Sequence, residues 1–379
     1  MYNDTIAFIR ETFNTPTEFI PLHEPRFTGN ERKYVLDAID STFVSSVGKY
    51  VDQFEQMMRE YTGAKHAIAV VNGTAALHMS LMLAGVERND LVITQALSFI
   101  ATCNAISYIG AEPVFIDVDS QRMGMSADAL QQFLSNVQLI DGNAIHKPTG
   151  RKISACVPMH TFGFPVEIDK IVDLCKQFNI PVIEDAAESL GSTYKGQQTG
   201  TFGLLGTYSF NGNKTITCGG GGIIVTNDDR IGELAKHLTT QAKVPHRWEY
   251  VHDHIGYNYR CPNLNAALAC AQLEQLDSFL NNKRKTALSY SRFFEEKPIQ
   301  FIEEQPDSQA NYWLNAILLN SHEERNLFLE QTNDSGVMTR PIWALMHRLK
   351  MFENCIHDNL TNSIDIEYRL VNIPSSVRK

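Results

Sequence analysis

The stretch HAIAVVNGTAALHMSLMLAG, residues 66–85, places a short apolar run, a small polar loop and a longer apolar segment in succession. HAIAVV (66–71) has the length and composition typical of a buried strand. TAALHMSLMLAG (74–85) has helical spacing and ends at a glycine. The stretch therefore predicts a strand that leads through a loop into a helix.

The same alternation continues to about residue 240. Strands are predicted at LVIT, EPVFIDV, ISACVPM, PVIED and IIVTN, and helices at FIATCNAISYIG and EIDKIVDLCKQF. Alternation of this kind indicates an α/β fold with a mostly parallel central sheet between helices. Ligands of such sheets bind outside the carboxyl ends of the strands. The segment 138–152 interrupts the pattern and is interpreted as a polar surface insertion.

A long helix is predicted over residues 263–294, and it leads into a smaller C-terminal portion. We therefore expect an N-terminal segment and a large domain in residues 1–265. Residues 266–379 are expected to form the bridging helix and a smaller C-terminal α+β domain.

Composition restricts the class of protein. The 379 residues carry 33 basic and 43 acidic side chains, a net charge of −10, which is unlike the basic footprint of a general nucleic-acid binder. The seven cysteines are scattered without a CxxC pair, which argues against a disulfide framework or a zinc site. With no signal peptide and no long apolar stretch evident, we expect a cytoplasmic protein that does not bind membranes.

The segment YSFNGNKTITCGGGG, residues 208–222, contains a single lysine, Lys214. A solvated loop charge is the commoner interpretation of such a residue. Asp185, at the end of the strand PVIED, is either a helix cap or the partner of a cationic ligand group. Pyridoxal phosphate needs such a carboxylate beside its ring nitrogen. The glycines at 219–222 let the backbone pass close to a bulky ring, and they do not form a dinucleotide fingerprint.

A phosphate site is predicted at the start of the helix after VNGTAAL. Backbone N–H groups there, with the hydroxyl of Thr74, are predicted to form an anion site. The same sequence pattern also occurs as an ordinary turn. Ser209 adds a second hydroxyl or is an ordinary strand residue. Phe99 is a candidate to stack on a planar ring, although an aromatic residue at such a position is more often core.

These stretches together resemble the DegT/DnrJ/EryC/StrS family of sugar aminotransferases, which have the aspartate aminotransferase fold (type I). The resemblance covers nearly the whole chain. The matching stretches are IPLHEPRFTGNE, VSSVGKYVDQFE, VNGTAALHMSL, SFIATCNAI, VPMHTFGFPVEI, IEDAAESLGS, YSFNGNKTITCGGGGIIVTND, GYNYRCPNLNAAL, TRPIWALMH and NIPSS.

The resemblance implies a pyridoxal 5'-phosphate cofactor and a role for each matching residue. Lys214 would be joined to the cofactor aldehyde and would later move a proton, and Asp185 would hold the ring nitrogen. The other implied cofactor contacts are Gly73, Thr74, Phe99, His160, Glu188, Ser209 and Asn258. Many members have glutamine or histidine where this chain has Glu188.

Asn258 would reach the cofactor phosphate of a neighbouring subunit, which implies a homodimer with shared active sites. The implied substrate contacts are Ser46 in VSSVG, Tyr257, Arg340 and His347. On the residues alone, Arg340 is interpreted as a surface arginine and His347 as a histidine with satisfied hydrogen bonds. No metal is expected among the site residues.

The activity implied by the resemblance is transfer of the amino group of L-glutamate to a nucleotide-linked 4-keto-6-deoxy sugar. Three stretches resemble the LegC-type subgroup, which acts on UDP-linked N-acetylated sugars for surface glycans. They are the insertion ending TGRK, the segment VPMHTFGFP and the tail IEYRLVNIPSS. A catalytically idle, cofactor-binding regulator or scaffold is the alternative. Sugar-dehydrating relatives carry histidine at the lysine position, so Lys214 argues against dehydration. A nucleotide-binding oxidoreductase lacks support because no glycine fingerprint is suitably placed.

Overall fold

One mixed sheet forms the centre of the computed structural model, which describes residues 2–379, so that only Met1 of the predicted large domain lies outside it. Its strands are β1 (His66–Val70), β2 (Leu91–Gln95), β3 (Glu112–Ile116), β6 (Ile153–Val157), β7 (Ile183–Asp185), β10 (Leu205–Ser209) and β11 (Gly222–Thr226). The order across the sheet is β1-β11-β10-β7-β6-β2-β3, because parallel bridges join β6 to β7. Only β11 runs antiparallel to its neighbours within this sheet. The predicted strands and the mostly parallel sheet are confirmed.

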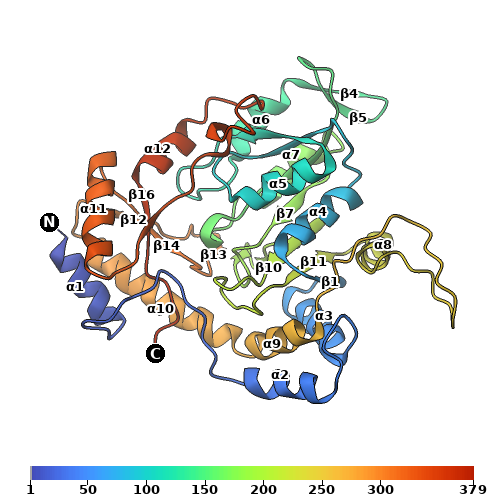
Figure 1. Ribbon diagram of the computed structural model, residues 1–379. Coiled ribbons are helices and arrows are strands. Elements are labelled where there is room, and N and C mark those ends of the chain that lie inside the picture. Colours follow the sequence, from blue (N-terminus) through green and yellow to red (C-terminus); the bar gives the residue numbers. More distant parts are fainter. Residues whose placement is uncertain (1) are drawn as a thin grey trace.

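Helices cover both faces of this sheet (Figure 1). One face carries α4 (Gly73–Leu83), α5 (Ile100–Ile109) and α8 (Asp229–Thr239), which share an apolar cluster with alternate strand residues. The other face carries α6 (Ala127–Leu134) and α7 (Ile168–Lys176) at one end, and α3 (Lys49–Thr62) and α9 (Asn263–Leu273) at the other. Side chains of β1 alternate between the two layers, as in Ala67 and Ile68. This burial on both faces explains why the strands read as continuous apolar runs.

The segment predicted as a polar insertion is a hairpin at the edge of the molecule. It is formed by β4 (Val137–Ile140) and β5 (Asn143–His146), which pair antiparallel. A separate small sheet consists of β8 (Thr193–Tyr194), β9 (Gln197–Gln198) and β13 (Ser308–Gln309). It joins the loop after Asp185 to the C-terminal portion of the chain.

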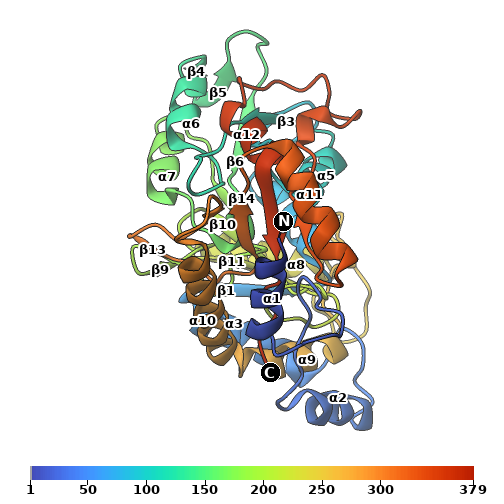
Figure 2. The ribbon, with the colours of Figure 1, turned by 90° about the vertical axis from the view of Figure 1, so that its left-hand side faces the viewer.

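The C-terminal portion has its own antiparallel sheet, in the order β12-β14-β16-β15. Its elements are α10 (Leu276–Phe294), β12 (Gln300–Phe301), β14 (Asn315–Leu318), α11 (His322–Asp334), β15 (Arg340–Pro341), α12 (Thr361–Arg369) and β16 (Leu370–Ile373), with the short 3-10 helix η2 (Met346–Arg348). The N-terminal helix α1 (Asn3–Thr12) lies against this portion (Figure 2). Tyr2 packs on Phe328 and Phe8 on Phe293, so the first residues contribute to the C-terminal core. The boundary near residue 265 stays a prediction.

The single helix predicted over residues 263–294 is wrong, because two helices, α9 and α10, meet at Glu274 and Gln275. The N–H of Gln275 bonds the carbonyl of Gln272, three residues back, which ends α9. The Gln275 side chain donates to Glu31 on α2 (Glu31–Asp40) at 2.6 Å. This contact across the fold fixes a break that the apolar spacing does not reveal.

Within residues 2–379, none of the helices combines the length and the apolar character needed to cross a bilayer.

Candidate active site

Asp185 ends β7, at the carboxyl edge of the central sheet, and is only 2% exposed. Its Oδ2 accepts a hydrogen bond from Thr102 Oγ1 at 2.6 Å, and its Oδ1 accepts one from the N–H of Ala187 at 3.2 Å. Burial raises the pKa of Asp185, whereas the bond from Thr102 is the largest effect that lowers it. Turns rather than a helix follow β7 over residues 186–192, so the helix-cap alternative is not realised. The site thus holds a buried, oriented carboxyl group.

Lys214 lies in the loop between β10 and β11 and points inward. Its Nζ is 3.2 Å from Glu188 Oε1 and 4.1 Å from the centroid of the Trp313 ring. The side chain is only 12% exposed, so the interpretation as a solvated loop charge is wrong. The amine is held in an enclosed, partly aromatic environment.

Glu188 connects this amine to the backbone on the other side of the site. While Oε1 accepts from Lys214, Oε2 accepts from the N–H of Phe162 at 2.9 Å. Burial raises the pKa of Glu188 to about 7, and the charge of Lys214 opposes that rise. Glu188 therefore exchanges a proton near neutral pH, which an ordinary glutamate does not do.

An anion site is formed where β1 leads into α4. The side chain of Asn72 caps α4 by accepting from the N–H of Ala75. Among residues 2–379 no acceptor contacts the N–H groups of Gly73 and Thr74, which leaves them available to an anion at the positive end of α4. Ser209 lies beside them, because a Cβ added to Gly73 would lie 2.9 Å from the Ser209 Cβ. The structure therefore brings the three predicted phosphate residues together.

Gly222 explains part of the run of four glycines. A Cβ on Gly222 would lie 2.4 Å from the backbone oxygen of Asn72, whereas one on Gly220 would have nothing closer than 3.6 Å. The missing side chain at Gly222 lets β11 pass directly against the start of α4. Gly219 has a φ of +81°, so the turn there also requires glycine.

His160 is fully buried beside the site, and both of its ring nitrogens are engaged. The N–H of Val166 donates to Nδ1 at 3.3 Å, so the proton is on Nε2, which donates to Glu184 at 3.0 Å. Glu184 also accepts from the N–H groups of Gly200, Phe202 and Gly203. Neither nitrogen of the His160 ring is therefore free to bind a ligand, and its predicted contact with the cofactor stays a prediction.

Phe99 stands at the start of α5, where its side chain is 45% exposed and is not core. Its ring packs edge-on against Trp343, with centroids 5.9 Å apart. Trp343 contacts Phe162, which in turn lies near Trp313, the ring beneath Lys214. A row of aromatic rings thus runs between Phe99 and the amine.

The predicted substrate residues lie on several peripheral segments. Ser46 is half-buried in a largely exposed loop that Asn263 ties to α9, and Tyr257 packs on His78 of α4. Arg340 on β15 is exposed and donates to Asn333. His347 lies 5.2 Å from the His357 ring, and burial lowers its pKa. Its Nδ1 is buried without a partner among the described residues, contrary to the interpretation as a satisfied histidine.

Asn258 is exposed on the segment that follows α8, which extends away from the rest of the molecule in yellow (Figure 1). It does not contact Lys214, Asp185 or the anion site of its own chain through any hydrogen bond of the described residues. Its predicted role toward a second subunit stays a prediction.

Three residues of the site were not predicted. Thr102 bonds Asp185, Trp313 contacts Lys214, and His23 has both ring nitrogens buried without a partner among residues 2–379. Burial, then the charges of Lys283 and Lys214, lower the pKa of His23 well below its ordinary value. His23 stands in IPLHEPRFTGNE, a matching stretch to which no role was given. Thr102 likewise stands in a matching stretch, SFIATCNAI, whereas Trp313 lies in none of them.

Comparison with known proteins identifies the family and the fold of this chain. Residues 25–378 match the DegT/DnrJ/EryC1/StrS aminotransferase family. A GDP-perosamine synthase of Escherichia coli O157:H7 is 38% identical over 358 residues, which cover 94% of this chain and 93% of that protein. A putative pyridoxal phosphate-dependent aminotransferase, EpsN of Bacillus subtilis (strain 168), is 37% identical over 335 residues, 88% of this chain and 84% of that one.

Among solved structures, Helicobacter pylori PseC, an aminotransferase involved in the biosynthesis of pseudoaminic acid, matches with a TM-score of 0.85. The match is 24% identical and covers 94% of each chain. At this identity the likeness establishes the fold alone. The predicted aspartate aminotransferase-like α/β fold is confirmed.

Proposed function

Because the chain belongs to the DegT/DnrJ/EryC1/StrS aminotransferase family, we propose that it transfers the amino group of L-glutamate to the keto carbon of a nucleotide-linked 4-keto-6-deoxy sugar. The chain is a sugar aminotransferase that depends on pyridoxal phosphate. The observation that carries the proposal is an enclosed amine, Lys214, which pairs with Glu188 in the turn directly after the buried carboxyl group of Asp185, at the end of β7. Together with the anion site at α4, these are the groups that the cofactor needs.

The residues present fit this cofactor. Asp185 is oriented by two donors and matches a protonated ring nitrogen, and the free N–H groups of Gly73 and Thr74 with Ser209 match a phosphate. When bound, pyridoxal phosphate supplies an electron sink for the charge that develops on the reacting carbon. Phe99 supplies an exposed aromatic face for a planar ring.

Lys214 is the group that we propose to hold and move the proton at the reacting carbons. Its Nζ is enclosed by Glu188 and the Trp313 ring, so its position is restricted and water is largely excluded. Such a positioned base typically contributes about 10²–10⁴ in rate. Burial raises the pKa of Glu188 to about 7, so this carboxyl group gains or loses its own proton near neutral pH beside the amine.

The identity of the sugar is the finer part of the proposal. The matches at TGRK, VPMHTFGFP and IEYRLVNIPSS support a UDP-linked, N-acetylated 4-keto-6-deoxy sugar. The relative named GDP-perosamine synthase supports a GDP-linked sugar as the second candidate. In either case Arg340, His347, Ser46 and Tyr257 are the proposed contacts of the nucleotide-linked sugar. We propose that the product enters surface polysaccharide synthesis, and the free cysteines support a cytoplasmic reaction.

We further propose a homodimer in which Asn258 reaches the phosphate of the second subunit. The segment that carries Asn258 exposes several large apolar side chains, which a monomer has no reason to present to water. They are Trp248, Tyr250, Val251 and Ile255. Asn258→Ala is expected to weaken retention of the cofactor in the dimer without altering the fold.

The alternative is a cofactor-binding regulator or scaffold without turnover. The enclosed amine of Lys214 and the oriented carboxyl group of Asp185 argue against it, because a regulator does not need a base beside the cofactor.

The proposal is tested by adding L-glutamate to the purified, cofactor-loaded protein and recording the absorption spectrum. We expect loss of the absorption of the lysine-bound cofactor, and mass spectrometry of borohydride-treated protein should find the cofactor on Lys214. Lys214→Ala should abolish both signals. A panel of UDP- and GDP-linked 4-keto sugars, with products identified by mass, then separates the two substrates. A spectrum that glutamate does not change would contradict the proposal and favour the regulator.

A further inference from the structure

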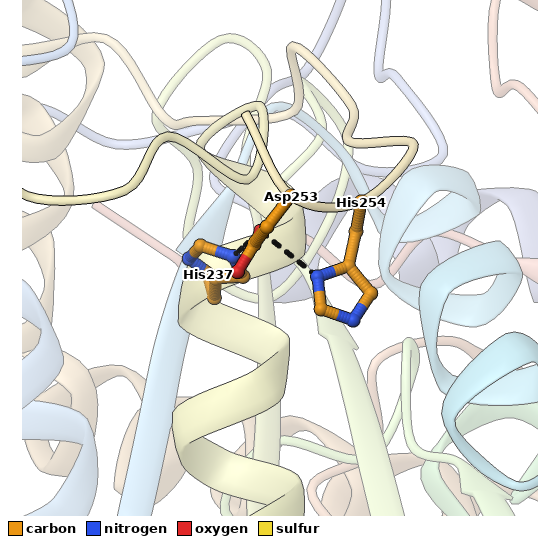
Figure 3. Close-up of side chains that lie close together, drawn as sticks. All are labelled: His237, Asp253 and His254. Atoms are coloured by element: carbon orange, nitrogen blue, oxygen red, sulfur yellow. Dashed lines mark hydrogen bonds and ion pairs between the residues drawn. The ribbon is translucent and has the colours of Figure 1, made fainter. Parts of the chain in front are cut away.

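His237, Asp253 and His254 form a cluster of three side chains to which the proposed reaction gives no role (Figure 3). His237 stands in the last turn of α8, and the other two residues lie on the segment that follows. Asp253 Oδ1 is 2.6 Å from His237 Nε2 and 2.9 Å from His254 Nδ1. One ligand atom from each side chain can be chosen so that all three lie within 4.8 Å of one another.

The backbone brings these residues together from two directions. The chain leaves α8 at Thr240, extends outward, and returns to pair again at Asn258. We call residues 240–258 the arm. Lys243 and His252 form a second bridge between its outgoing and returning parts. The cluster therefore joins the returning part of the arm to the end of α8.

We propose that His237, Asp253 and His254 bind a divalent transition metal ion, with Zn²⁺ as the best match. Two imidazoles and one carboxylate are a donor set that suits zinc, whereas calcium and magnesium prefer oxygen ligands throughout. All three side chains are accessible, at 25%, 46% and 55% exposure, so an ion reaches the site and a water completes its coordination. This site goes beyond the proposed aminotransferase reaction and does not depend on it.

The geometry requires only a small adjustment. Zinc–ligand distances of about 2.0–2.2 Å in a tetrahedral site place neighbouring ligand atoms roughly 3.3–3.5 Å apart. The two nitrogen–oxygen distances in the cluster must therefore open by roughly 0.4–0.9 Å, which exposed side chains achieve by small rotations. Both imidazoles donate to the same carboxylate oxygen, so the cluster is already gathered around one point.

The proposed ion would act as a structural link. It would fix the returning part of the arm to α8 only a few residues before Tyr257 and Asn258, and beside the exposed aromatic residues of the arm. Its chemical role is therefore to order the arm, not to take part in amino transfer.

The test is isothermal titration of the full-length, cofactor-loaded protein with ZnCl₂, supported by elemental analysis after dialysis. We expect about one zinc ion per chain in the wild type. His237→Ala and His254→Ala should each weaken binding by at least about 10–100-fold, the range that follows even from loss of an outer-shell partner. The matched control is His252→Ala, which removes a histidine of the same arm whose Nδ1 contacts the Gln241 carbonyl oxygen instead. It should bind zinc as the wild type does.

Two results would overturn the proposal. One is wild-type protein that shows no saturable zinc binding, in which case the cluster is a hydrogen-bonded triad only. The other is binding that persists unchanged in both His237→Ala and His254→Ala, or that is lost equally in His252→Ala. Because His254 is more than half exposed, its variant is expected to fold, and circular dichroism with the cofactor absorption checks this directly.

Discussion

Lys214 and Glu188 form an ion pair across the candidate active site, with 3.2 Å between Nζ and Oε1. The pair links the loop before β11 to the turn after β7, and the second Glu188 oxygen extends the link to the backbone of Phe162. One buried carboxyl group thus restrains both the proposed base and the segment that contains His160. Because burial raises the pKa of Glu188 to about 7, this restraint depends on pH in the physiological range.

Glu188→Gln tests this dependence. The amide oxygen can still accept from Phe162, but the charge that holds Lys214 is lost at every pH. We expect the glutamate half-reaction at pH 8 to fall by roughly 10–100-fold, which corresponds to about 1.5–3 kcal/mol for a charge-assisted hydrogen bond. The wild-type pH profile should show an inflection near 7, because Glu188 is ionised above that value, and the variant should lack it.

The matched control for that variant is Glu55→Gln, which breaks a glutamate–lysine pair of 2.6 Å with Lys236 at the β1 edge of the sheet. It should leave the half-reaction and its pH profile unchanged. Stopped-flow absorption at several pH values measures all three proteins. An inflection near 7 that persists in Glu188→Gln would assign it to another group.

Thr102→Val is expected to shift the acid limb of activity. The Thr102 hydroxyl donates to Asp185 and lowers the carboxyl pKa, against the larger effect of burial, which raises it. Removing the hydroxyl therefore raises the pKa of Asp185 further, so the group becomes protonated at a higher pH. A lost hydrogen bond to a charged group, about 1.5–3 kcal/mol, corresponds to a shift of about one to two pH units.

The pH dependence of kcat/KM measures this shift, with Thr94→Val as the control. Thr94, near the end of β2, is also a buried threonine, but its hydroxyl donates to the carbonyl of Val157. Equal profiles for the two valine variants would show that Thr102 does not tune Asp185.

Gly222→Ala and Gly220→Ala are expected to have opposite effects, although both change one glycine of the same run. The Cβ at 222 would collide with the backbone of Asn72 at the start of α4, which should cost about 1–3 kcal/mol and release the phosphate more readily. The Cβ at 220 has ordinary contacts, and replacing a glycine there should be neutral or stabilise by about 0.4–1 kcal/mol. Thermal unfolding and cofactor loss on dialysis measure both effects, and equal behaviour would contradict the close approach of β11 to α4.

The sequence predicts those parts of the site that depend on regular structure. Asp185 ends an apolar strand, and Gly73 and Thr74 start a helix after another strand, so sheet geometry alone brings them to one edge. Contacts between segments far apart in the chain leave no such pattern. Trp313 lies against Lys214 only because the C-terminal portion folds back on the large sheet. The sequence around each of the two residues contains no periodic pattern that would indicate this contact.

The same reason explains where the predicted helix of residues 263–294 fails and where a histidine was overlooked. Gln275 breaks the helix through a bond to Glu31, more than two hundred residues earlier. His23 is recognisable only by its two unpartnered buried nitrogens, a property of the packed structure. The local spacing of residues therefore predicts the helices, the strands and the site residues at strand ends. Contacts between distant segments determine the helix break and the remaining site residues.

Lys283 on α10 provides a test of stability rather than of activity. It is 1% exposed, donates to the carbonyl oxygens of Trp313 and Ser375, and burial lowers its pKa to about 7. The unfolded chain keeps this amine protonated up to a pH of about 10.4. Between pH 7 and 10 the unfolded state therefore binds more protons than the folded state, and the stability should rise with pH.

Each unit of pH in that range should add up to about 1.4 kcal/mol to the free energy of unfolding through this one group. Lys283→Met has a similar length and no charge, so its unfolding free energy should rise less steeply between pH 7 and 9. Urea unfolding at these two pH values measures the slopes, with Lys285→Met, on the same helix, as the control. The Lys285→Met variant should retain the wild-type slope, because the Lys285 side chain is exposed in the folded protein. Equal slopes in wild type and Lys283→Met would mean that the buried amine remains charged.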